Sequence, residues 1–150
     1  MKKLVRVASP AAIAVLRQAT ALWPKRRKSS DGLLPSLAHL RANPKSDHNT
    51  GLAVDLSHDP HSGVDCGEIF KKLQDDPRVA YLIFSGKIWT PDKGVHKYDG
   101  ANQHVKHLHI SIKPQSAKDA SPWFGWMGKP KAINQVKARL KRKAKKKEDK

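Results

Sequence analysis

A chain of 150 residues has the length of one ordinary domain and can bury a core of its own, while the single Cys66 excludes an internal disulfide framework. Thirty Lys and Arg against thirteen Asp and Glu give a formal net charge of +17, which attracts polyanions. No apolar run reaches the roughly eighteen residues of a membrane span, so we expect no transmembrane segment. No cysteine-enzyme motif surrounds Cys66, and we expect a small, semi-buried residue there.

The first segment of the chain superficially resembles a secretion signal, with two lysines ahead of an apolar stretch. Arg6 and Arg17, however, interrupt that stretch. Ser9 is a good helix N-cap, and Pro10 suits the first helical position. The pattern therefore predicts an amphipathic helix over residues 9–22 rather than a cleaved signal. Its apolar positions at helical spacing are Ile13, Leu16 and Leu22.

The middle of the chain alternates short elements. Period-two alternation and β-branched residues indicate strands, whereas apolar residues on one face of a 3.6-residue repeat indicate a helix. We predict a strand at 51–57, a helix at 66–76 with Ile69, Phe70 and Leu73 on one face, a strand or strand pair turning at Gly86 within 79–89, a loop at 90–102 and a second β run at 107–112. This order favours an α+β domain, with a small antiparallel sheet and helices packed on one side.

The basic charge is concentrated at the end of the chain. Residues 129–150 contain eleven Lys or Arg and only two acids, Glu148 and Asp149. Blocks of like charge repel one another, so we expect a domain over 1–128 followed by a disordered arm or frayed helix over 129–150. The arm would bind nucleic acid, anionic lipid or an anionic cell-wall polymer, or would only solubilise the chain.

Strand alternation brings candidate metal ligands onto common faces. Within 51–57, Asp55 points away from the face of Val54 and Leu56. In the second β run, His107 and His109 share one face. Together with His48, which precedes the first strand, these side chains form a set of nitrogen and oxygen ligands suited to zinc with an open coordination position.

The stretch SDHNTGLAVD, residues 46–55, resembles the Ser-x-His-x-x-Gly-x-Ala-x-Asp signature of the zinc D-alanyl-D-alanine peptidases. That group includes vancomycin-resistance dipeptidases, phage endolysin peptidases, a murein endopeptidase and the related hedgehog domain. The matching fixed positions are Ser46, His48, Gly51, Ala53 and Asp55. The resemblance implies a hedgehog-like fold, Zn²⁺ held by His48, Asp55 and His109, and hydrolysis of peptide bonds in bacterial peptidoglycan. It covers residues 9–115 and not the basic tail.

One position departs from the family pattern. Many members carry an acidic general base three residues before the last zinc histidine, where this chain has Lys106. The murein endopeptidase branch instead has histidines five and two residues before that ligand, which correspond to His104 and His107. A neutral imidazole can carry protons near neutral pH, so we assign proton transfer first to His107 and then to His104. In the alternative, one of them only fixes a ligand by hydrogen bonding.

Three residues are candidates for substrate binding: Arg41, as a partner for a substrate carboxylate, Ser46 of the motif, and Trp89, as part of a groove. His39 and His96 look incidental. We expect a monomer that acts at the bacterial cell wall and, without a convincing signal, reaches it through a phage holin or in a virion. A metal-dependent nuclease and a non-catalytic, zinc-containing wall-binding module remain as alternatives.

Overall fold

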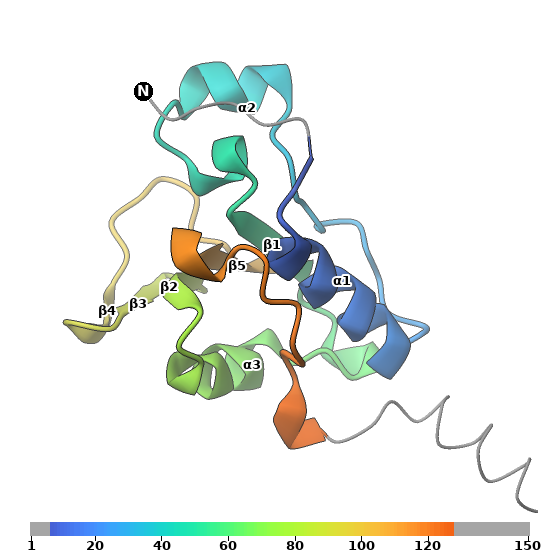
Figure 1. Ribbon diagram of the computed structural model, residues 1–150. Helices are drawn as coiled ribbons and strands as arrows, with labels where there is room; N and C mark the ends of the chain where they lie inside the picture. Colours follow the sequence, from blue (N-terminus) through green and yellow to red (C-terminus); the bar gives the residue numbers. More distant parts are fainter. Residues whose placement is uncertain (1–6, 128–150) are drawn as a thin grey trace, which may run out of the picture.

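The computed structural model describes residues 7–127 and has an α+β architecture (Figure 1). Five strands form one antiparallel sheet in the order β1-β5-β2-β3-β4. The strands are β1 (Ala53–Ser57), β2 (Val79–Phe84), β3 (Lys87–Thr90), β4 (Gly94–Lys97) and β5 (His107–Ile112). The α-helices are α1 (Pro10–Leu22), α2 (Leu37–Ala42) and α3 (Cys66–Lys72).

Helix α1 confirms the prediction of a helix that begins after Ser9. The Ser9 hydroxyl accepts a hydrogen bond from the backbone N–H of Ala12 at 3.2 Å, and Pro10 occupies the first helical position. The predicted apolar face is confirmed only in part, because Leu16 and Leu22 pack at the margin of the core and other side chains form the buried face. The buried side chains are Ala11, Ala12, Ala14, Val15 and Ala19, whereas Ile13, Leu16 and Leu22 are only partly buried. Small side chains allow the helix backbone to approach β1 closely.

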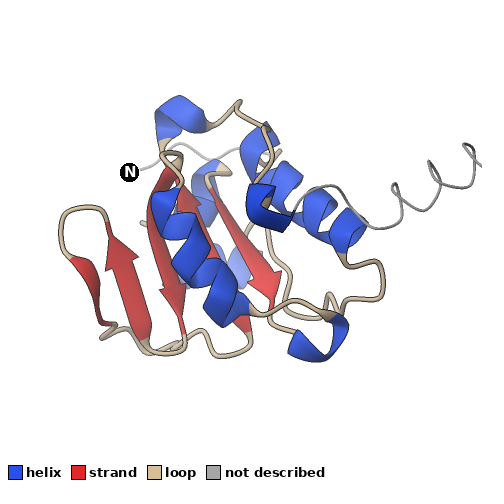
Figure 2. Ribbon diagram, turned by 90° about the horizontal axis from the view of Figure 1, so that it is seen from below, coloured by secondary structure: helices blue, strands red, loops and turns tan. Residues whose placement is uncertain are grey.

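The core lies between one face of the sheet and the helices α1 and α3, and Figure 2 shows helical segments lying across the strands. The strand side chains Val54, Leu56, Leu108 and Ile110 are all fully buried there. Helix α3 and the turn after it contribute Ile69, Phe70 and Leu73, as predicted. Each such aliphatic or aromatic side chain stabilises the fold by about 1.5–3 kcal/mol. The side chains on the other face of β1 and β5 point away from this core, and a site can form there.

Strands β2 and β3 form a hairpin. Ser85 and Gly86 make its turn with φ values of 49° and 78°, as expected for a strand pair that turns at Gly86. The predicted loop over 90–102 is wrong for β4, which pairs with β3. Its sequence, GVHK, is short and largely exposed, so it lacks the apolar alternation by which strands are recognised.

The segment before α2 closes the free edge of β1. Gly32 and Asp55 exchange backbone hydrogen bonds of 3.1 and 2.8 Å, which adds a one-residue bridge to the sheet. Within residues 7–127, no helix is both long and apolar enough to cross a membrane. The basic tail predicted over 129–150 lies outside the residues that the structure describes.

Candidate metal centre and its cavity

Each fixed position of the 46–55 motif has a role in the local structure. Ser46 caps the 3₁₀ turn Asp47–Thr50, because its hydroxyl accepts from the backbone N–H of His48 at 3.3 Å. Gly51 ends the turn with φ 72°, and a Cβ there would lie 3.1 Å from the carbonyl oxygen of Val7. The chain then enters β1, where Ala53 is fully buried. The turn and the strand together place His48 beside Asp55.

The three predicted metal ligands converge. Nε2 of His48 lies 3.3 Å from Oδ2 of Asp55, and Nδ1 of His109 lies 3.2 Å from Oδ1 of the same carboxylate. One ligand atom from each of the three residues lies within 4.8 Å of the other two. Asp55 and His109 are register partners on the neighbouring strands β1 and β5, so the sheet itself sets their separation.

Neighbouring groups hold both imidazole rings. Nδ1 of His48 lies 2.7 Å from the carbonyl oxygen of Leu33. Because a carbonyl only accepts, Nδ1 carries a hydrogen, and Nε2 is the ring nitrogen that faces Asp55: it donates to the carboxylate when the ring is protonated and has a lone pair for a metal ion when the ring is neutral. Nε2 of His109 lies 2.8 Å from the hydroxyl of the fully buried Ser111, which leaves Nδ1 facing the carboxylate. Such outer partners fix the tautomer and orientation of metal-binding histidines.

The electrostatics of this cluster favour a cation. Burial alone would raise the pKa of Asp55, but hydrogen bonds from His109 and His48 outweigh it and hold the pKa well below its usual range. Burial alone would lower the pKa of His48, yet the hydrogen bond and charge of Asp55 raise it overall. A partly buried carboxylate that stays ionised among imidazoles attracts a proton or a metal ion to the space between them.

The two proposed proton carriers lie beside this cluster. Nε2 of His107 is 3.7 Å from Oδ2 of Asp55, and the rings of His107 and His104 are 5.0 Å apart and nearly perpendicular. Burial lowers the pKa of His107, and it lowers the pKa of His104 to about 4. Both rings are therefore neutral at pH 7. His104 has a φ of 56°, and its Nδ1 is buried without a hydrogen-bond partner.

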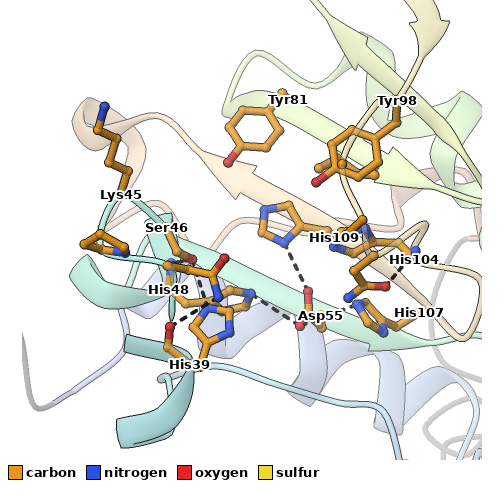
Figure 3. A pocket seen from close by; sticks show the side chains of 16 residues that line it. His39, Lys45, Ser46, His48, Asp55, Tyr81, Tyr98, His104, His107 and His109 are labelled. Carbon is orange, nitrogen blue, oxygen red and sulfur yellow. Dashed lines mark hydrogen bonds and ion pairs between the residues drawn. The ribbon is translucent and has the colours of Figure 1, made fainter. Parts of the chain in front are cut away.

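A cavity of about 690 Å³ opens over the cluster (Figure 3). One wall comes from α2 and the segment after it, and the other from the loop that leads into β5. The lining residues are His39, Asn43, Pro44, Lys45, Ser46, His48, Asp55, Tyr81, Ile83, Tyr98, Gly100, Ala101, Asn102, His104, His107 and His109.

Of the predicted substrate-binding residues, only Ser46 lines this cavity. Arg41 is exposed on α2 and is not among the lining residues. Trp89 packs against the hydrophobic core, because it is paired with the buried Leu82 across the β2–β3 hairpin. These placements leave no support for a substrate role of Arg41 or Trp89.

Other residues of the site carried no sequence signal. His39, taken as incidental, lines the cavity, and its ring is 5.7 Å from that of His48. Tyr81 stacks on His109 at 5.5 Å with an interplanar angle of 18°. Lys45 lines the cavity beside Ser46. The positions of His39, Tyr81 and Lys45 depend on how α2 and β2 pack against the two motifs. Neither hydrophobic periodicity nor motif spacing predicts this packing.

Cys66 lies outside this cavity and is fully buried at the start of α3, which agrees with a structural residue. Burial raises the pKa of its thiol to about 12. The thiol is therefore protonated at neutral pH and is not a nucleophile in the folded protein.

Comparisons with known proteins give a match at the level of a protein family. No curated protein and no solved structure matches the chain. Among protein families, the one described as VldE, C-terminal domain, matches residues 7–109, a span that begins before α1 and ends at the last candidate metal ligand. Because this match covers more than half of the sequence, the chain belongs to the VldE C-terminal domain family.

Proposed function

We propose that the protein is a zinc-dependent peptidase that hydrolyses peptide bonds of bacterial peptidoglycan, either a terminal D-alanyl-D-alanine bond or a cross-link. The observation that carries the proposal is the convergence of His48, Asp55 and His109 at the base of an open cavity. The peptidoglycan substrate is supported by the resemblance of residues 46–55 to the peptidase signature, and the hedgehog-like fold is proposed on the same ground.

The donor set fits Zn²⁺. Two imidazole nitrogens and one carboxylate oxygen are the ligands of many catalytic zinc sites, which keep a further position for water or substrate. The contact with Leu33 leaves Nε2 of His48 facing an ionised carboxylate at 3.3 Å. A nitrogen and a carboxylate oxygen at that distance need a cation between them, either the proton of a protonated His48 or a metal ion that replaces it. When bound there, Zn²⁺ would lower the pKa of a coordinated water toward about 7 and polarise a carbonyl group.

The surrounding side chains supply proton transfer and positioning. His107 lies beside Asp55 and is neutral, so it can take a proton from a water in the cavity and return it to the leaving amine. The ring of His104 packs against that of His107 in an edge-to-face contact at 5.0 Å, and His104 is the second candidate for proton transfer. The hydroxyl of Ser46 lies at the edge of the cavity, where it can hydrogen-bond a peptide group of the substrate.

Paired metal and turnover measurements test the proposal on the full chain. We expect about one zinc per molecule, release of peptide fragments from purified sacculi, and loss of both on treatment with a chelator. His48→Ala, Asp55→Ala and His109→Ala should each lose zinc and activity. His96→Ala is the matched control, since His96 is exposed on β4 and is not a cavity-lining residue.

The same assay separates the alternatives. Stoichiometric zinc without hydrolysis of sacculi or soluble muropeptides would identify a non-catalytic wall-binding module. Metal-dependent cleavage of duplex DNA in place of sacculi would identify a nuclease. Absence of bound zinc after loading under non-denaturing conditions would contradict the metal site itself.

A further inference from the structure

His39 is the one histidine of the cavity to which no role in metal binding or proton transfer has been given. Hydrogen bonds on both sides hold its backbone. Its N–H donates to the Ser36 hydroxyl at 3.1 Å, and its carbonyl oxygen accepts from the N–H of Asn43 at 2.8 Å. The ring is therefore presented from a fixed position on α2 rather than from a loose loop.

The ring of His39 is also tied to the metal-ligand turn. Its Nε2 lies 3.3 Å from the hydroxyl of Ser46, and its plane stands at 90° to the ring of His48. The Ser46 oxygen accepts from the backbone N–H of His48, so its own hydrogen is free to be donated to Nε2 of His39. In that arrangement Nδ1 of His39 carries the ring hydrogen and is the remaining donor of the ring.

His39 and the proton carriers occupy opposite walls. In Figure 3, His39 lies with Ser46 and Lys45 on one side, His104 and His107 lie on the other, and Asp55 is between them. Peptide hydrolysis needs a proton acceptor for the attacking water and, separately, a donor for the oxygen on which negative charge develops. A carbonyl group bound over Asp55 would have one of these groups on each side.

Other polar residues of the cavity are less suited to this task. The Tyr81 hydroxyl already interacts with Ser111 and Asp47. Lys45 is exposed, with a long, flexible and strongly hydrated side chain. A preorganised donor stabilises a developing charge without reorganising during the reaction. The His39 ring, which is held at its backbone and at Nε2, meets this condition better than the flexible Lys45 side chain.

We infer that His39 is a substrate-contacting catalytic residue, whose ring N–H donates a hydrogen bond to the scissile carbonyl oxygen as negative charge develops on it. The inference rests on the proposed peptidase function and deepens it. The loss of one such donor lowers kcat by about 100- to 1000-fold, while the zinc ligands stay in place.

The test compares His39→Ala, His39→Asn and the control His96→Ala in the zinc-loaded full chain. Asn keeps an N–H donor near the place of Nδ1. Bound zinc, kcat and KM on a soluble muropeptide, and the Kd of a phosphinate peptide are measured, because the phosphinate carries anionic oxygens in a tetrahedral arrangement. For His39→Ala we expect full zinc, a fall in kcat of about 100-fold or more with little change in KM, and a parallel loss of phosphinate affinity. His39→Asn should recover part of both losses.

Three outcomes would overturn the inference. Unchanged kcat and phosphinate affinity in His39→Ala would show that the ring does not touch the reacting oxygen. Loss of zinc in His39→Ala would make it a support of the metal site. If Ser46→Ala reproduced the whole effect and His39→Ala added nothing to it, His39 would act only by positioning Ser46. Each outcome is read against an active wild-type protein, whereas a wild type that cleaves no peptide refutes the proposed function first.

Discussion

The carbonyl oxygen of Leu33 lies 2.7 Å from Nδ1 of His48, so a backbone group 15 residues upstream fixes which ring nitrogen of a candidate metal ligand faces Asp55. The same short segment bridges to Asp55 through the backbone of Gly32. Two of the three candidate ligands are therefore held by one stretch of chain that has no recognisable motif. Its geometry should matter for zinc affinity as well as for stability.

Gly32→Ala should weaken zinc binding. A Cβ at position 32 would lie 3.2 Å from Oδ2 of Asp55, which is tighter than an ordinary van der Waals contact, so the carboxylate must shift. We expect zinc affinity to fall by about 10- to 100-fold, the scale observed when groups that orient ligands are disturbed. Competition with a chromophoric chelator measures the change. Gly125→Ala is the control, because a Cβ at Gly125 meets nothing within 4 Å; equal affinities in both variants would contradict the prediction.

His107 and His104 should be separable from the ligands by metal analysis. His107→Ala should keep zinc and lose about 100-fold or more in rate, the scale of losing a general acid or base. For His104 we choose Asn, because φ is 56° there and Asn tolerates the left-handed region better than Ala. His104→Asn should keep zinc with a smaller loss of rate. Zinc lost in His107→Ala but kept in His109→Ala would mean that the third ligand is His107.

The placement of the candidate ligands on β1 and β5 could be predicted from the sequence, because strand alternation is a local property. Val54 and Leu56 are buried on one face of β1 and Asp55 faces the cavity, as their alternation predicts. The capped start of α1 was equally visible in Ser9 and Pro10. In each case the signal lies within a few neighbouring residues.

Features set by long-range packing could not be predicted in this way. Trp89 faces the core because the Ser85–Gly86 turn sets its register opposite Leu82. Helix α2 has no buried residue, so no apolar pattern indicates where His39 lies. The contact between Leu33 and His48 joins a loop to a 3₁₀ turn, and only the folded chain brings them together.

The metal-free protein should lose stability as pH falls from 7 to 5. Burial lowers the folded-state pKa of His39, His104 and His107, so the unfolded chain takes up protons below about 6.5 that the folded chain resists. His48 has a raised pKa and acts in the opposite direction, stabilising the fold at low pH, but it is one group against three. Thermal unfolding in the presence of a chelator, at several pH values, measures the combined effect of these four histidines on stability.

His104→Asn provides the control for this pH effect, because it removes the histidine with the largest lowering of pKa. The variant should show a shallower fall in melting temperature between pH 7 and pH 5 than the wild type. Equal slopes would show that His104 is not protected from protonation in the folded state. A wild-type melting temperature that rose toward pH 5 would contradict the balance of three lowered groups against one.

Deletion of residues 129–150 should separate wall binding from chemistry. This segment contributes nine of the seventeen net positive charges and follows the residues 7–127 that the structure describes. We expect the truncated chain to keep its zinc and its rate on a small soluble peptide, and to bind sacculi less well at low salt. Exposed charges are screened over about 8 Å at physiological ionic strength, so binding by the intact chain should also weaken as salt is added. Co-sedimentation with sacculi measures both effects.

A variant with the tail lysines and arginines replaced by Gln keeps the length of the tail and removes its charge, so it should behave like the deletion. If the truncated and intact chains sedimented equally at low salt, the charge of the tail would have no part in recognising the wall.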